Sequence, residues 1–497
     1  MSVKKLIVKY LAKKNKKNID SWSKNSISNQ KKLFKKLMFS LERTEFGKDI
    51  GASKEMEIEE YRKNCTIKSY EDFSSYIKKI SLGEKNVLWP GAPLYFAKTS
   101  GTTSGTKYIP LTKKMLDYQI KSSKEALLLY AFKTKKYDAI NGKMMFIQGS
   151  PLLTKHSKIN TGRLSGIVAN HIPFFLKSNR LPSRKTNITN NWEEKLEKII
   201  NETIGVDLRL IGGIPPWVIM YFQKILERTS EETTLNIFPN LSLYVHGGVN
   251  FSPYKKTLKG IMPKADFLEF FPASEGFFAY QDDIEKEGLL LLTNHGVFYE
   301  FIEVDQFLNN NYKRLSLEDV ELNKNYVLII STVAGLWSYN IGDTVRFIDL
   351  NPFRVVVTGR IKHFISAFGE HVIGKEVESA LENSVDEFGG KVAAFTVCPN
   401  INPKEGLPHH EWFIEFSEKP KQFNKFCVHL DNMVRKQNIY YNELIRDRVL
   451  KPLVVNCVKS GGFNKYMDSI GKLGGQNKCP SLSNDRKIGN FLNEYII

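Results

Sequence analysis

The feature that most constrains the fold is an alternation of short apolar runs with longer amphipathic runs through the middle of the chain. The apolar runs at residues 143–150, 207–213 and 241–248 each end in Gly or Ser and predict strands. Between them, residues 190–204 and 217–229 carry apolar side chains at helical spacing and predict helices. Strands that alternate with helices in this way are typical of layered α/β structures with partly parallel sheets.

The pattern changes after residue 288, where short apolar strands separated by turns follow one another without helices. A helix pattern (374–388) and a strand pattern (392–399) return toward the C-terminus. A chain of 497 residues is too long for one ordinary domain. We therefore expect an α/β protein with a large N-terminal domain, residues 1–358, that includes a β-rich subdomain, and a small α+β C-terminal domain, residues 359–497.

The chain carries a formal net charge of +19, and its lysines are densest between residues 4 and 36. No nucleic-acid-binding motif of recognisable spacing accompanies them, so we expect a solvated surface and no nucleic-acid partner. The five cysteines form no C-x-x-C pair, which argues against a zinc site or a disulfide framework and favours a reducing compartment. We expect no signal peptide and no membrane-spanning segment, and we predict a cytoplasmic enzyme or binding protein.

The segment KTSGTTSGTKYIPLT, residues 98–112, combines small hydroxyl side chains with two glycines and a lysine, and a helical pattern follows it at residues 114–133. It is not a Walker A loop, because Gly101 and Gly105 are only four residues apart. Glycine nevertheless frees backbone amides to point inward, and the hydroxyls and the lysine can offset phosphate charge. The segment therefore predicts a phosphate cradle, with a flexible Ser/Gly linker as the alternative.

Two carboxylates follow strand patterns elsewhere in the chain. In FFPASEGFFAY, Ser274 and Glu275 end an apolar strand, at the edge of an α/β sheet where ligands commonly bind. The carboxylate is a hard oxygen ligand of the kind that suits Mg²⁺. In WSYNIGDTVRF, Asp343 follows Gly342, and its two oxygens could accept both hydroxyls of a ribose. Taken singly, each segment is also compatible with an ordinary turn.

Five segments taken in order resemble the motifs of adenylate-forming enzymes, and most closely those of the GH3 family of acyl acid–amido synthetases. TSGTTSGTKYIP is similar to the family's phosphate motif, FPASEG to its second motif and YNIGD to its Y-R-x-G-D motif. GRIKHFISAFGE and GGQNKCP are similar to the segments around and beyond the interdomain hinge. The resemblance runs from about residue 89 to 490. It departs at Asn340, where the family usually has arginine, and at His363, where the wider superfamily often has a hinge aspartate.

The resemblance implies an ATP- and Mg²⁺-dependent ligase that joins a small-molecule carboxylic acid to an amine, typically an amino acid, through an acyl-adenylate. It also implies that the C-terminal domain is mobile and rotates between the two half-reactions. Lys107, Glu275 and Lys478 are the implied catalytic residues, and Glu275 is the implied Mg²⁺ ligand. The implied nucleotide-binding residues are Ser100, Gly101, Thr102, Thr103, Gly105, Ser274, Tyr339, Asp343 and Arg360.

The acyl acid is expected near residues 170–175, 212–217 and 245–251, whose aromatic residues and glycines suit a flat or apolar acid. The candidate contacts are His171, Trp217 and Val249. Either His171 or His246 could take a proton from the incoming amine. Ordinary core packing is the alternative for all of these segments.

Two other functions remain compatible with the sequence. An acyl-CoA ligase or a stand-alone acyl-adenylating enzyme would share the first half-reaction and differ in the acceptor. A non-catalytic basic protein that binds RNA or a membrane surface through residues 4–36 belongs to a different class. The sequence leaves the acid, the amine and the oligomeric state open.

Overall fold

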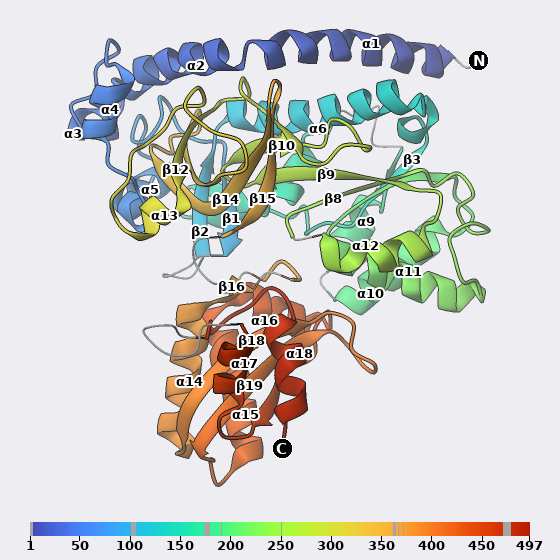
Figure 1. Ribbon diagram of the computed structural model, residues 1–497. Helices are drawn as coiled ribbons and strands as arrows, with labels where there is room; N and C mark the ends of the chain where they lie inside the picture. The colour runs from blue at the N-terminus through green and yellow to red at the C-terminus, as the bar shows by residue number, and fades with distance from the viewer. Residues whose placement is uncertain are drawn as a thin grey trace. The chain divides into compact units, whose positions relative to one another are not determined.

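The chain separates into two compact units, and each has a hydrophobic core of its own. The large unit is built of Met1–Thr99, Lys107–Thr189 and Lys195–Ile361, and the C-terminal unit is built mainly of Lys362–Ile497. The computed structural model (Figure 1) describes residues 3–100, 106–172, 179–189, 191–249, 251–360, 364–365, 367–370, 372–470 and 479–497.

Over the described residues, an eleven-stranded sheet runs through the large unit in the order β12-β13-β14-β15-β11-β10-β9-β8-β7-β3-β6. The strands from β9 to β6 pair in parallel, and those from β12 to β9 pair antiparallel. The expected α/β class, with a partly parallel sheet and a β-rich continuation, is confirmed. The strands are β3 (Lys143–Phe146), β6 (Arg180–Leu181), β7 (Leu208–Gly212), β8 (Leu243–Gly247), β9 (Asp266–Ala273), β10 (Gly276–Tyr280), β11 (Leu289–Leu291), β12 (Val297–Glu303), β13 (Asn325–Thr332), β14 (Tyr339–Leu350) and β15 (Phe353–Arg360).

Helices cover the parallel part of this sheet, with α6 on one face and α11 and α12 on the other (Figure 1). α11 has proline in its first turn, where a missing N–H costs no helical hydrogen bond, and it ends at Ser230 in the left-handed conformation (φ 55°). The helices among or beside these strands are α6 (Lys113–Thr134), η2 (Tyr137–Ile140), α7 (Leu164–Asn170), α9 (Arg184–Asn187), α10 (Trp192–Thr203), α11 (Pro215–Thr229), α12 (Ser252–Ile261) and α13 (Val304–Leu308).

A four-stranded sheet in the order β2-β1-β5-β4 holds the segment that precedes α6. It consists of β1 (Tyr95–Ser100), β2 (Thr106–Leu111), β4 (Thr154–His156) and β5 (Ile159–Gly162). β1 pairs in parallel with β5, and β2 leads directly into α6. The N-terminus of α6 is capped by Thr112, whose hydroxyl accepts from the Met115 amide at 3.2 Å.

The first part of the chain is helical. Two long helices, α1 and α2, lie nearly end to end along one side of the large unit (Figure 1). Ile19 and Trp22 of α1 pack against Ala126 and Leu129 of α6, which fixes α1 to the unit. The helices are α1 (Val3–Lys24), α2 (Ser26–Leu41), α3 (Glu45–Asp49), α4 (Ile58–Asn64), η1 (Glu71–Phe73) and α5 (Ser74–Ser81).

The C-terminal unit is α+β, with a three-stranded sheet in the order β18-β19-β20 and a two-stranded hairpin. Its strands are β16 (Phe364–Ile365), β17 (Val372–Ile373), β18 (Lys391–Asn400), β19 (His409–Glu418) and β20 (Val454–Val458). Its helices are α14 (Gly374–Phe388), α15 (Phe423–Gln437), α16 (Ile439–Arg446), α17 (Gly462–Ser469), α18 (Lys487–Leu492) and η3 (Asn493–Tyr495). In the part of the chain that the structure describes, no helix has the length and apolarity needed to cross a bilayer.

Candidate active site

The structure describes part of the predicted site. Side chains are described for Lys107, Ser274, Glu275, Tyr339, Asp343, His171, Trp217 and Val249. For Ser100 and Arg360 the backbone alone is described. Gly101, Thr102, Thr103, Gly105, His363 and Lys478 lie outside the described residues.

The strongest link between two predicted motifs is a contact between Lys107 on β2 and Tyr339, the first residue of β14. Nζ of Lys107 donates to the Tyr339 hydroxyl at 3.3 Å, across 232 residues of sequence. The same nitrogen lies 5.5 Å from the ring centroid of Tyr70 and 5.9 Å from that of Tyr339. Two aromatic rings therefore flank the ammonium group at distances at which cation–π attraction operates.

Tyr70 is held in place by the strand that carries Lys107. Its hydroxyl accepts from the backbone N–H of Tyr108 at 2.8 Å. Burial raises the pKa of Tyr70 to about 12, and this hydrogen bond only partly opposes the shift. The phenol is neutral at physiological pH, so it orients the lysine without neutralising its charge.

Asp343 lies in an irregular stretch of β14. Between β13 and β14, Val327 pairs with Thr344 and Ile329 with Asn340, so four residues of β14 span the length of two on its partner. Gly342 within this bulge has a φ of 86°, a conformation that glycine adopts without strain. Bulges of this kind redirect side chains and are common beside active sites.

Asn340, the departure from the family motif, supports the bulge. Its side-chain oxygen accepts from the Gly342 backbone N–H at 2.8 Å, which closes an Asx turn around the glycine. The Asn340 side chain therefore shapes the backbone that presents Asp343. Asp343 itself is buried.

The register of β14 and β15 brings a second pair of predicted residues together. Asp343 lies directly opposite Arg360 in this antiparallel pair. The next residues along the ladder include Thr344 and Thr358, whose hydroxyl oxygens are 2.9 Å apart. Residues 339–343 of YNIGD and residues 359–360 are thus on neighbouring strands of the sheet.

Ser274 and Glu275 form the tight turn between β9 and β10, since Ala273 pairs with Gly276. α6 holds this turn, because Nε2 of Gln119 donates to the Ala273 carbonyl oxygen at 2.9 Å. A Cβ placed on Gly276 would lie 2.9 Å from Cγ2 of Val297, so β10 begins in close contact with the start of β12.

This close approach connects the turn to the Lys107–Tyr339 contact. Val297 pairs with Thr332, and Ile330 on the same strand pairs with Tyr339. The antiparallel part of the sheet is therefore curled. As a result, the 274–275 turn and the start of β14 lie at the same end of this part. Thr112, the cap of α6, reaches the same region by donating to the Val333 carbonyl oxygen at 2.9 Å.

The residues predicted for the acyl acid lie on separate elements. His171 follows α7 and is exposed, and its Nε2 is 2.9 Å from the Tyr95 hydroxyl on β1. Trp217 lies in the first turn of α11, and Val249 follows β8. Their common role as acyl contacts stays a prediction.

His246, near the end of β8, is buried against an aromatic ring. Its ring stacks on that of Phe251 with centroids 3.7 Å apart. Burial, with a smaller contribution from Lys255, lowers the pKa of His246 to about 3. A group with such a pKa is a weak base, so burial argues against a proton-accepting role for this histidine.

The sequence reasoning missed Tyr70 and Gln119, both of which hold parts of the candidate site. Neither residue belongs to a recognisable motif. Their contacts with residues 108 and 273 depend on how distant segments pack, which local spacing does not reveal.

Comparison with protein-family models gives matches along most of the chain. The GH3 family N-terminal domain matches residues 15–186 and 152–267, the central domain matches 290–360 and the C-terminal domain matches 375–487.

Curated relatives include plant enzymes. The indole-3-acetic acid-amido synthetase GH3.15 of Arabidopsis thaliana is 34% identical over 542 residues, covering 88% of this chain and 88% of the relative. The jasmonoyl-L-amino acid synthetase JAR4 of Nicotiana attenuata is 22% identical, with 83% of each chain covered. The match to the Arabidopsis indole-3-acetic acid-amido synthetase GH3.3, at 24% identity, spans 56% of this chain and 43% of the relative.

Among solved structures, the GH3.15 acyl acid amido synthetase superposes with a TM-score of 0.61 at 15% identity, covering 97% of this chain and 96% of that one. A 2-hydroxyisobutyryl-CoA ligase, in complex with 2-HIB-AMP and CoA, gives a TM-score of 0.57 at 11% identity, with 94% and 91% covered. These likenesses show the fold. Together with the family models and the similarity to GH3.15, they establish that the chain belongs to the GH3 family.

Proposed function

We propose that this protein is an ATP-dependent ligase that adenylates a carboxylic acid and transfers the acyl group to an amine, with an amino acid as the expected acceptor. Membership of the GH3 family and the named activities of its relatives, which are amido synthetases, support the proposal. The observation in the structure that carries it is the contact between Lys107 and Tyr339, which joins the phosphate motif to the YNIGD motif.

In the first half-reaction, a carboxylate oxygen attacks the α-phosphorus of ATP and the bond to pyrophosphate breaks. In the second, the amine nitrogen attacks the acyl carbon, AMP leaves with the bonding electron pair, and the nitrogen loses a proton. The first step brings anions together, so positioning and charge neutralisation supply most of the catalysis. Lys107 is the proposed source of positive charge at the phosphates, oriented by its two tyrosines.

The remaining roles follow the family pattern and are part of the proposal. Ser100, Thr102 and Thr103 would donate hydroxyls to phosphate, and Gly101 and Gly105 would leave room for backbone amides. Ser274 would contact the adenylate, Asp343 would accept from the ribose hydroxyls, and Arg360 would contact ribose or phosphate. Lys478 would serve one half-reaction from the C-terminal domain. His171, Trp217 and Val249 would line the acyl site.

The proposed Mg²⁺ ligand is Glu275. Among the described residues, no group of three or more His, Cys, Asp and Glu side chains could hold a metal ion. A single carboxylate on the β9–β10 turn fits Mg²⁺, because this ion is usually bound by one or two carboxylates together with water and substrate phosphates. When bound, it would supply charge neutralisation between the phosphate oxygens.

A two-domain cycle would separate the half-reactions. The proposed domains are residues 1–358 and 359–497, and the separate core of the C-terminal unit is compatible with rotation as a body. Rotation would admit the amine after adenylation. A cytoplasmic location and the absence of a nucleic-acid partner also remain predictions.

The decisive experiment measures exchange of labelled pyrophosphate into ATP with a panel of carboxylic acids. An acid that supports exchange is then converted to its adenylate on the enzyme, and either an amino-acid mixture or CoA is added. Discharge by amino acids with amide formation supports the proposal. Discharge by CoA alone supports an acyl-CoA ligase, a second candidate that the fold shared with the 2-hydroxyisobutyryl-CoA ligase favours. Absence of exchange with every acid would contradict both and favour a non-catalytic basic protein.

A further inference from the structure

The first two helices concentrate much of the chain's positive charge. Residues 3–41 contain twelve lysines and a single acidic residue, Asp20. The formal net charge of the whole chain is +19. At about 1.5 Å per residue, α1 and α2 together extend over roughly 57 Å. The proposed catalytic site uses none of these residues.

The exposed side chains of α1 include a row along one side of the helix. Positions 6, 10, 13, 17 and 24 are spaced by three, four or seven residues, so they lie along one face of the helix. All five are exposed, whereas Ala12, Ile19 and Trp22 are buried against the unit. The face combines the lysines at 13, 17 and 24 with the apolar side chains at 6 and 10.

The lysines of this face are available to an outside anion. Asp20 is paired with Lys16 at 2.5 Å, at the border of the face. Within the described part of the chain, Lys13, Lys17 and Lys24 make no ion pair. A row of such ammonium groups attracts an anionic surface over its whole length.

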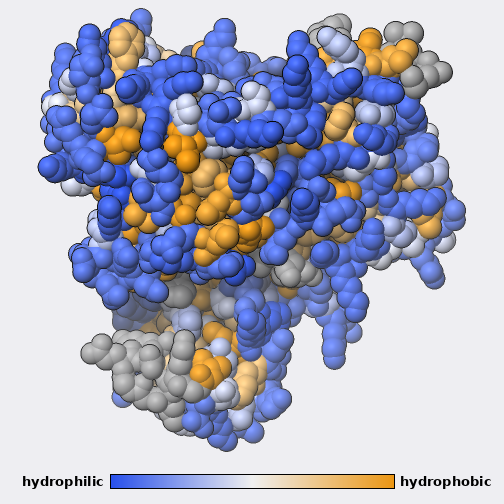
Figure 2. Space-filling model, turned by 45° about the horizontal axis from the view of Figure 1, so that its top comes forward, coloured by the Kyte–Doolittle hydropathy of each residue, from blue (hydrophilic) through white to orange (hydrophobic). Residues whose placement is uncertain are grey.

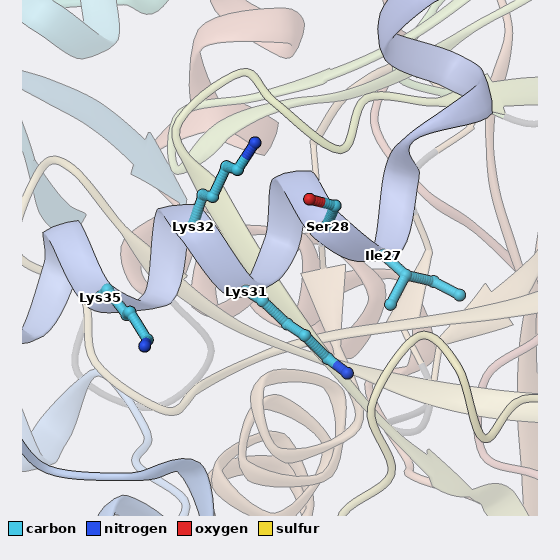
Figure 3. Close-up of a pocket in the computed structure, with 5 residues that line it drawn as sticks. All are labelled: Ile27, Ser28, Lys31, Lys32 and Lys35. Carbon is cyan, nitrogen blue, oxygen red and sulfur yellow. The ribbon is translucent and has the colours of Figure 1, made fainter.

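α2 continues the row. Its side chains Ile27, Ser28, Lys31, Lys32 and Lys35 line an open hollow of about 510 Å³. Figure 3 shows Lys31 and Lys35 extending to one side of the helix and Lys32 to the other. Lys31 is paired with Glu318 at 2.9 Å, so Lys32 and Lys35 are the lysines here that extend the row. Their side chains extend to opposite sides of the helix, which suits separate anions better than one bound phosphate.

Large apolar side chains accompany these lysines. The exposed fractions are 49% for Leu6, 52% for Ile7, 67% for Tyr10, 37% for Ile27 and 47% for Phe39. Figure 2, in which the side carrying α1 and α2 is turned forward, shows hydrophobic patches between the hydrophilic side chains. Aliphatic side chains beside lysines match a lipid surface, which offers both anionic headgroups and an apolar layer, whereas a nucleic-acid backbone offers only the charge.

We propose that the exposed face of α1 and α2 binds an anionic phospholipid surface. The lysines contact the headgroups, and Leu6, Ile7 and Tyr10 enter the boundary between headgroups and acyl chains. This binding is peripheral and reversible. It brings an enzyme for organic acids to the surface where apolar acids partition, and it does not depend on the proposed catalytic function.

The test is flotation of the full-length protein with vesicles of phosphatidylcholine alone, or with about 30% phosphatidylserine, at about 0.15 M salt. Binding is expected to the anionic vesicles and not to the neutral ones, and to weaken at higher salt. Neutralising Lys13, Lys17 and Lys24 to Gln should lower the partition coefficient roughly fivefold per lysine, or about 100-fold in all.

A charge-matched control changes three exposed lysines of the C-terminal unit, Lys404, Lys421 and Lys425, to Gln. It should leave vesicle binding unchanged. Equal loss in both triple variants would overturn the proposal, and so would equal binding to neutral vesicles. Circular dichroism of each variant checks that the helices persist.

A second variant tests the apolar component. Leu6→Ser with Tyr10→Ser keeps every lysine and should reduce anionic-vesicle binding about tenfold or more. Unchanged binding would overturn the insertion of these side chains. If the protein bound a single-stranded RNA homopolymer and did not float with vesicles, the partner of this face would be a nucleic acid, and the proposal would be overturned.

Discussion

The hydrogen bond between Lys107 and Tyr339 offers the sharpest test of the proposed phosphate site. Its length of 3.3 Å exceeds the common value of about 2.9 Å, so we place it at the low end for a hydrogen bond to a charged group, about 1.5 kcal/mol. Tyr339→Phe keeps the buried ring and removes the hydroxyl group that accepts from Lys107. If all of this free energy serves to position the ammonium group in the transition state, the change should lower kcat/KM for pyrophosphate exchange about tenfold.

Lys107→Ala removes the charge itself and should cost about 100-fold to 1,000-fold, as does the loss of one preorganised donor elsewhere. The two changes should not add. In the Lys107→Ala background the Tyr339 hydroxyl no longer orients an ammonium group, so Tyr339→Phe should have almost no further effect. The assay is a double-mutant cycle on kcat/KM for exchange, measured with an acid that the wild-type enzyme accepts.

Lys114→Ala is the matched control, because this lysine is exposed at the start of α6, close in sequence to Lys107. It should leave exchange unchanged. Full additivity of the Lys107 and Tyr339 effects would refute the positioning argument while leaving a role for the lysine. Wild-type exchange by Lys107→Ala would refute the assignment of the phosphate site itself.

Three further predictions concern the Mg²⁺ ligand, the loss of stability at acidic pH and the cost of breaking a buried ion pair. Glu275→Ala should abolish exchange at low Mg²⁺ and recover part of it at high Mg²⁺; activity independent of Mg²⁺ in both proteins would contradict the assigned ligand. The pKa of His246 is about 3 when folded and about 6.5 when unfolded, so the unfolded state binds the extra proton and stability is lost as pH falls below about 6.5. His246→Phe should therefore lose about 2 kcal/mol less than wild type between pH 7 and pH 5 in urea unfolding, and parallel pH profiles would exclude this histidine as the cause. Glu300→Gln leaves Arg314 buried without its carboxylate and should lower the free energy of unfolding by about 3 kcal/mol. Glu318→Gln breaks the exposed ion pair with Lys31 and should lower it by less than about 1 kcal/mol. Equal losses would contradict the role of burial.

Periodicity predicted the helices well where one face is apolar and the ends carry turn residues. The expected helix at 114–133 is α6 (Lys113–Thr134), and the expected helix at 374–388 is α14 (Gly374–Phe388). The strand expected at 143–150 is shorter, ending at Phe146. Beyond Ile147, residues 148–150 are Gln, Gly and Ser, which are polar or small and lack the alternating apolar pattern that keeps a chain in a sheet.

The candidate site was predictable only through the order of its motifs. Each segment taken singly is compatible with a turn, and the structure gives the physical reason why local spacing is insufficient. The 274–275 turn and Tyr339 are brought to one end by the curl of strands β10, β12, β13 and β14, which depends on close packing at Gly276. Such a curl is a property of pairing among distant strands.

Asn340 is uncharged, and this affects where the candidate site has its positive charge. Its side chain closes the turn at Gly342, so this position shapes the backbone and contributes no cation. Adenylation still requires positive charge against the phosphates of ATP. The structure places Lys107 against the ring and hydroxyl of Tyr339, one residue before Asn340. A lysine held by neutral aromatic groups keeps its charge and loses little conformational freedom on binding. In the proposed first half-reaction we therefore expect Lys107, and not position 340, to supply positive charge at the phosphates.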